Sequence, residues 1–160
     1  MMDERKSRFK GTAVFRLYRS FSPASRAAIL FTIPFTLVDA IHYYTAGTSL
    51  LLSFPLVVLI YLACGVVAAR MATQDNPTAD KLFRVGGMAG LRLWLTSTAI
   101  NTLISVLLGF VSLGITIVGT ILYLCFSAPL HALGSWLIGG IGGWIHQQIM
   151  ERTRPDNFAE

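Results

Sequence analysis

The sequence predicts an all-α integral membrane protein with four transmembrane helices arranged as two tight hairpins. Of its 160 residues, 54% are apolar and only 13% are charged, which is about half the charged share of soluble domains. Residues 93–150 contain no Lys, Arg, Asp or Glu, and residues 27–69 contain a single charge, Asp39. The thirteen Lys and Arg residues all fall outside these two stretches.

The length of each uncharged stretch predicts the number of helices in it. A bilayer core takes roughly 20 helical residues per crossing. Residues 27–69 therefore accommodate two helices separated by the turn-like sequence TAGTS, and residues 93–150 accommodate two and not three. Helices are expected because each one satisfies its backbone hydrogen bonds within its own segment. The predicted spans are residues 24–45, 50–69, 91–112 and 118–146, in a membrane domain over 23–150 with a polar tail at 151–160.

The basic residues predict the orientation. Seven lie before the first span or in its first turn, four lie in or beside the central loop at 70–90, two follow the last span, and neither hairpin turn carries one. The positive-inside rule therefore places both termini and the central loop in the cytoplasm. The net charge of +5 is then expected to attract the anionic headgroups of the bilayer, and nucleic acid is not an expected partner. The expected location is the cell membrane, with the bacterial plasma membrane as the default.

The N-terminal segment, residues 1–22, is basic and is expected to lie on the cytoplasmic side. Within TAVFRLYRSF the apolar residues share one helical face and the arginines point the other way, which predicts a short amphipathic helix in the membrane interface. The alternative is a disordered basic tail. Ser22 followed by Pro23 is typical of a helix start, with serine as the cap. The apolar face consists of Val14, Leu17, Tyr18 and Phe21, and the arginines are Arg16 and Arg19.

The glycine-rich stretch GSWLIGGIGGWIHQQ, residues 134–148, raises the question of a nucleotide site. It lacks the spacing of a dinucleotide fingerprint, the lysine of a phosphate-binding loop and a preceding strand, so both nucleotide interpretations fail. Small residues four apart do form one helical face, which is typical of close helix packing in lipid. The candidate packing residues are Ser135, Gly139 and Gly143, together with Gly86 and Gly90. Whether their partner helix belongs to the same chain is left open.

A few polar residues within the predicted spans are candidates for another role. Asp39, His42 and Tyr43 share a helical face and form a possible proton-handling or ligand-binding group, although Asp39 is also close enough to the outer turn to be interfacial. In the third span, Asn101 and Ser105 share a face and would hydrogen-bond across the bundle. In a small transporter or channel-forming oligomer, Asp39 and the Asn101/Ser105 face would line a polar path.

His131 lies near the middle of the fourth span and is the candidate cofactor ligand. A histidine inside a bundle would hold a haem iron or the magnesium of a chlorophyll-type pigment. Bis-histidine haem ligation is disfavoured, because His42 and His146 lie at different depths from His131. The alternative is a hydrogen-bonded packing histidine with no cofactor. No metal site is expected, and Cys64 and Cys125 are interpreted as packing residues.

These patterns favour a structural role over a catalytic one. Asp39 is the sole carboxylate within a predicted span, and no nucleophile–base pair can be assembled, so an enzyme is not expected. The favoured function is an accessory or scaffolding subunit that packs through its small-residue helix faces against other membrane proteins or against itself. The alternatives are the transporter or channel and the pigment- or haem-binding subunit.

Overall fold

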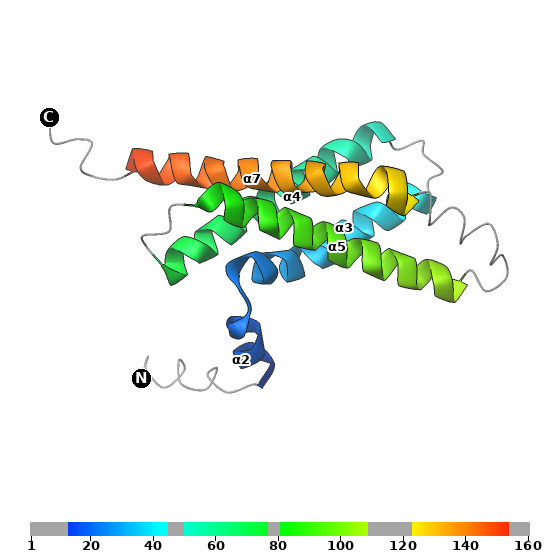
Figure 1. The fold of residues 1–160 in the computed structure, drawn as a ribbon, viewed down its shortest axis with the longest axis horizontal. Coiled ribbons are helices and arrows are strands. Elements are labelled where there is room, and N and C mark those ends of the chain that lie inside the picture. Colours follow the sequence, from blue (N-terminus) through cyan, green and yellow to red (C-terminus); the bar gives the residue numbers. More distant parts are fainter. Residues whose placement is uncertain (1–12, 45–49, 77–80, 109–122, 154–160) are drawn as a thin grey trace, which may run out of the picture.

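The computed structural model describes residues 13–44, 50–76, 81–108 and 123–153, with side chains at most of these positions. All regular secondary structure in these ranges is helical, so the all-α prediction is confirmed for this part of the chain. Four long helices form a bundle, and a short helix precedes them (Figure 1). The elements are α2 (Ala13–Ser20), α3 (Pro23–Tyr44), α4 (Leu50–Asp75), α5 (Leu82–Leu108), the π-helical turn η2 (Tyr123–Ser127) and α7 (Ala128–Thr153).

Local sequence accounts for where α3 begins. The Ser22 hydroxyl accepts a hydrogen bond from the Ser25 backbone N–H at 3.4 Å, which is the interaction of an N-cap. Pro23 occupies the first helical position, where its missing N–H costs nothing. The predicted start of this helix is therefore confirmed.

The helices α4 and α5 extend into the region expected to be a loop at 70–90. Residues 70–75 continue α4, and residues 82–90 are the first turns of α5. Helix continues there because good helix formers lie on both sides of the NP turn, such as Arg70 and Met71 before it and Leu82 after it, while asparagine and proline favour a turn. The connection between α4 and α5 is therefore shorter than the predicted loop at 70–90.

Consecutive long helices run antiparallel, so α3 and α5 begin at the end of the bundle where α4 and α7 finish (Figure 1). Arg26 near the start of α3 pairs with Asp75 at the end of α4. The helices α4 and α5 pack against each other and against both α3 and α7, which lie on opposite sides of that central pair. We call the end where α3 and α5 begin the charged end, because it carries Arg26, Arg70, Asp75, Lys81, Arg84, Arg92, Glu151 and Arg152.

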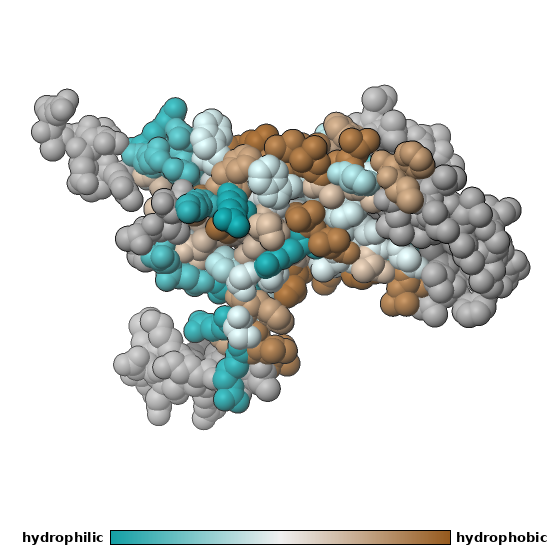
Figure 2. Space-filling model, viewed as in Figure 1, coloured by the Kyte–Doolittle hydropathy of each residue, from teal (hydrophilic) through white to brown (hydrophobic). Residues whose placement is uncertain are grey.

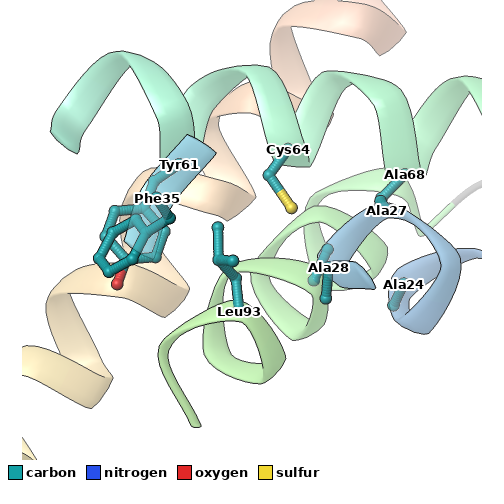
Figure 3. Packing of buried hydrophobic residues seen from close by; sticks show 9 residues of the cluster. Ala24, Ala27, Ala28, Phe35, Tyr61, Cys64, Ala68 and Leu93 are labelled. Carbon is teal, nitrogen blue, oxygen red and sulfur yellow. The ribbon is translucent and has the colours of Figure 1, made fainter. Parts of the chain in front are cut away.

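The core where α3, α4 and α5 meet is built mainly from small side chains. Ala27 and Ala28 of α3 are grouped with Cys64 and Ala68 of α4, and Leu93 of α5 points into the same cluster (Figure 3). Leu93 and Cys64 are the largest side chains that are fully buried in the described residues. Farther from the charged end, the rings of Phe35 and Tyr61 pack with their centroids 5.2 Å apart.

One stretch of the described helices is long and apolar enough to cross a membrane. It is Phe54–Asp75 of α4, with a mean hydropathy of 2.1 over its most apolar window. Pro23–Val38 of α3 is a shorter apolar helix. By length and composition, α4 is therefore compatible with membrane association.

Candidate functional site

The most extensive helix contact in the described residues lies between α5 and α7, where glycines bring the two backbones together. A methyl group added at Gly139 would lie 2.5 Å from the Gly86 carbonyl oxygen and 3.1 Å from the Gly90 Cα. One added at Gly86 would lie 2.9 Å from the backbone nitrogen of Gly143. One added at Gly90 would lie 3.1 Å from the carbonyl carbon of Ser135. We call Gly86, Gly90, Ser135, Gly139 and Gly143 the glycine seam.

The glycine-rich part of α7 also contacts α4. A methyl group added at Gly65 of α4 would lie 2.8 Å from the carbonyl carbon of Gly139. One added at Gly142 would lie 3.1 Å from both the Leu62 carbonyl carbon and the Val66 nitrogen. Gly139 thus faces α4 and α5 at once, and α7 occupies the groove between these two helices.

Two aromatic side chains flank the seam in a reciprocal arrangement. The indole of Trp136 on α7 covers Gly87 on α5, where an added methyl group would lie 2.8 Å from Trp136 Nε1. The phenyl ring of Phe83 on α5 covers Gly140 on α7, where the equivalent distance to Phe83 Cζ is 2.7 Å. The two rings meet edge to face with centroids 5.2 Å apart. Each ring fills space that a side chain on the facing glycine would occupy, which fixes the register of α5 against α7.

The small residues of α7 face α4 and α5 of the same chain. The five residues selected by their spacing all lie at contacts within this chain. Spacing on α5 and α7 did not reveal the part played by α4. A usable signal was present, since Gly65 and Ala69 are also four residues apart, as are Cys64, Ala68 and Ala72.

The polar candidates are not assembled into a site by the described residues. The backbone of Asp39, His42 and Tyr43 belongs to the last turns of α3, and Ser105 belongs to α5, but their side chains lie outside the described part. Asn101 is half-buried. Ser97 and Ser135 are the buried polar side chains of the described core, and each donates a hydrogen bond to a carbonyl of its own helix, on Trp94 and Ala132.

His131 lies on the outer surface of α7 rather than inside the bundle. Its side chain is exposed, and Nδ1 lies 2.8 Å from the carbonyl oxygen of Ser127, one turn earlier. Cys125 is exposed as well, whereas Cys64 is fully buried in the core. Among the described residues, this outward-facing imidazole is not enclosed by the other helices.

The charged end joins all four long helices through polar contacts. The Arg26 side chain, only 12% exposed, forms a salt bridge with Asp75, which is 52% exposed. The guanidinium of Arg92 on α5 donates hydrogen bonds to the hydroxyls of Ser22 and Ser25 at the start of α3. On the far side, Thr73 Oγ1 of α4 lies 3.4 Å from His146 Nε2 of α7. These contacts hold the α2–α3 junction against α5 at the level of Arg92.

No group of three or more metal-ligating side chains comes together among the described residues. The arrangement therefore has the chemistry of a packing interface: backbone contacts at glycine, flanking aromatic rings and a polar end. Comparisons of the chain with protein-family models, with curated proteins and with solved structures found no match.

Proposed function

We propose that this chain is a four-span integral membrane protein that serves as an accessory or scaffolding subunit, packing against other membrane proteins or against copies of itself. In this proposal α3, α4, α5 and α7 are the spans. The charged end and both termini lie in the cytoplasm. The cell membrane is its location.

The distribution of side-chain size carries the membrane part of the proposal. Alanine and glycine line the helix contacts, while large apolar side chains point outward from every long helix. The exposed fraction is 72% for Ile33 of α3, 68% for Phe54 of α4, 59% for Leu103 of α5 and 72% for Leu130 of α7. In water, each such side chain left exposed would lose roughly 1.5–3 kcal/mol of the stabilisation that burial gives. In lipid, an exposed apolar side chain loses little stabilisation, and small residues at the helix contacts are the usual means of close packing.

The position of the charges supports the orientation. Figure 2 shows hydrophilic residues gathered at the charged end and a broad hydrophobic surface along the rest of the bundle. Among residues with described side chains on the four long helices, the charged ones are confined to that end. Such an asymmetry favours a cytoplasmic charged end under the positive-inside rule.

The subunit role is supported by how the interior is filled. The described core consists mainly of small side chains, and its buried serines bond to their own helices. The glycine seam is occupied within the chain, so a partner would have to contact the outer faces. The outer face of α7 offers a continuous apolar surface in which Gly134 has nothing within 4 Å of its added methyl position. Its exposed apolar residues are Leu130, Leu133, Leu137, Ile141 and Trp144.

Cysteine accessibility tests the orientation. In a Cys125→Ser background, Gln74→Cys places an exposed thiol at the charged end, and Thr48→Cys places one in the first predicted outer turn. We expect a membrane-impermeant maleimide to label Thr48→Cys in intact cells and Gln74→Cys only after the cells are broken. Labelling of both variants in intact cells would contradict the orientation, and labelling of both in the soluble fraction would contradict the membrane location.

Particle mass after mild detergent extraction tests the subunit role. We expect the tagged chain to elute in a particle heavier than one chain, because a subunit retains its neighbours through its apolar outer faces. Replacing Leu133 and Leu137 on the outer face of α7 with serine should reduce that mass, while Leu103→Ser on α5 serves as a control on another face. A single chain extracted from native membranes by the mildest detergents would contradict the proposal.

A further inference from the structure

The short helix α2 stands apart from the bundle at the charged end. It projects sideways from the start of α3 and has no extensive contact with the long helices among the described residues (Figure 1). Its apolar side is consequently uncovered: Val14 is 77% exposed, Leu17 61% and Phe21 41%. Two such side chains on one face of α2, together with Phe21 directly after its last residue, require a covering phase or partner.

The polar contacts at the junction fix the depth of α2. The residues that link α2 to α3 are held by Arg92, which hydrogen-bonds to Ser22 and Ser25. Arg92 is also the last charged residue before the uncharged stretch 93–150. The helix α2 therefore leaves the bundle at the level where the charged part of α5 gives way to its apolar part. In a four-span bundle this level is the boundary between headgroups and hydrocarbon.

The charges of α2 complement the anionic surface at that level. Arg16 and Arg19 are exposed and lie on the helical face opposite Val14, Leu17 and Phe21. The Arg19 guanidinium lies 4.8 Å from the centre of the Phe15 ring, which keeps its charge close to the helix. Tyr18, which shares the face of Val14, donates a hydrogen bond of 3.4 Å to the Arg26 carbonyl, which ties α2 to α3. The described part of α2 carries no acidic residue.

We propose that α2 is a docking element for anionic phospholipid, with Val14, Leu17 and Phe21 inserted at the acyl boundary of the cytoplasmic leaflet and Arg16 and Arg19 paired with headgroup phosphates. This inference rests on the proposed function, since it takes the bundle to span the membrane. A helix lying flat at this depth, tied to the first span and to α5, sets how deeply the charged end sits in the bilayer.

Spin-label accessibility in the full-length protein tests this proposal. Labels are attached to Val14→Cys, Arg16→Cys and Leu103→Cys in a Cys125→Ser background, and the fully buried Cys64 is kept. The protein is reconstituted in vesicles of equal parts phosphatidylcholine and phosphatidylglycerol. Oxygen concentrates in hydrocarbon and a polar nickel chelate stays in water. We expect oxygen to relax the Val14→Cys and Leu103→Cys labels, and the nickel chelate to relax the Arg16→Cys label.

The three positions separate failure of this proposal from failure of the proposed function. If the nickel chelate relaxes the labels at both Val14→Cys and Arg16→Cys while oxygen still relaxes the label at Leu103→Cys, only the docking of α2 is overturned. Nickel access at Leu103→Cys overturns the membrane-spanning bundle. Protection of Val14→Cys from both reagents indicates a protein occupant and also overturns the lipid assignment.

The charge requirement has its own test. Near an anionic surface each arginine contributes about a fivefold change in the docking equilibrium. In vesicles of phosphatidylcholine alone, or with Arg16→Gln and Arg19→Gln in the mixed vesicles, the Val14→Cys label should shift toward nickel access. Equal accessibility in both lipids and with both arginines removed would overturn the anionic-lipid assignment.

Discussion

Replacing Gly139 with leucine is expected to prevent α7 from seating between α4 and α5. The new side chain would start 2.5 Å from the Gly86 carbonyl oxygen and 3.1 Å from the Gly90 Cα, both on α5. Neither obstacle is a side chain that can rotate away, because both are helix backbone. Overpacking usually costs about 1–3 kcal/mol, and we expect the cost here to exceed about 3 kcal/mol because two helices must move.

The matched control lies on the same helix. Gly134 has no heavy atom within 4 Å of the position where its Cβ would be built. Gly134→Leu should therefore change the free energy of unfolding by less than about 1 kcal/mol, and in the stabilising direction if the better helix propensity of leucine dominates. Thermal unfolding of both purified variants in the same detergent measures the difference. Equal melting temperatures would show that α7 does not pack on α4 and α5 through the seam.

Leu93→Ala is expected to give the second large effect. Leu93 is fully buried where α3, α4 and α5 meet, and its neighbours there are mostly alanines that cannot extend into the vacated space (Figure 3). Truncation of a buried leucine costs about 2–5 kcal/mol, with the larger values where the surroundings do not collapse. We expect the upper half of that range, measured as a loss of unfolding free energy in denaturant or as a lower melting temperature.

Leu95→Ala provides the comparison, because Leu95 lies two residues away on α5 and is 51% exposed. An outward-facing leucine makes few contacts within the chain, so its truncation should cost about 1 kcal/mol or less. If the two truncations were equally costly, Leu93 would not be the central core residue of the bundle.

The helical architecture could be predicted because the residues that specify it are local in the sequence. Uncharged stretches, the Ser22–Pro23 cap and the NP turn each act over a few residues. The end of α4 is harder to predict, since the charge of Arg70 favours a loop although arginine is a good helix former. A charge ends an apolar stretch without ending a helix.

The residues of the candidate site could be predicted from the sequence, but the helices that they contact could not. Spacing of four identified Gly139 and Gly143, but a spacing pattern describes one helix and does not name the helix it faces. The role of Gly65 depends on the rotation of α4 against α7, which only the assembled bundle specifies. His131 was placed by its depth along the helix, and depth does not determine whether a residue faces inward or outward.

The double contact of Gly139 bears on the order in which the chain matures. Helix α7 is the last of the four to leave the ribosome, and the backbone positions of Gly65 and Gly86 have no other helix to cover them in the described structure. A nascent chain that ends before α7 therefore carries an open groove between its second and third long helices. The bundle therefore closes only once α7, the last of the four long helices, has been made.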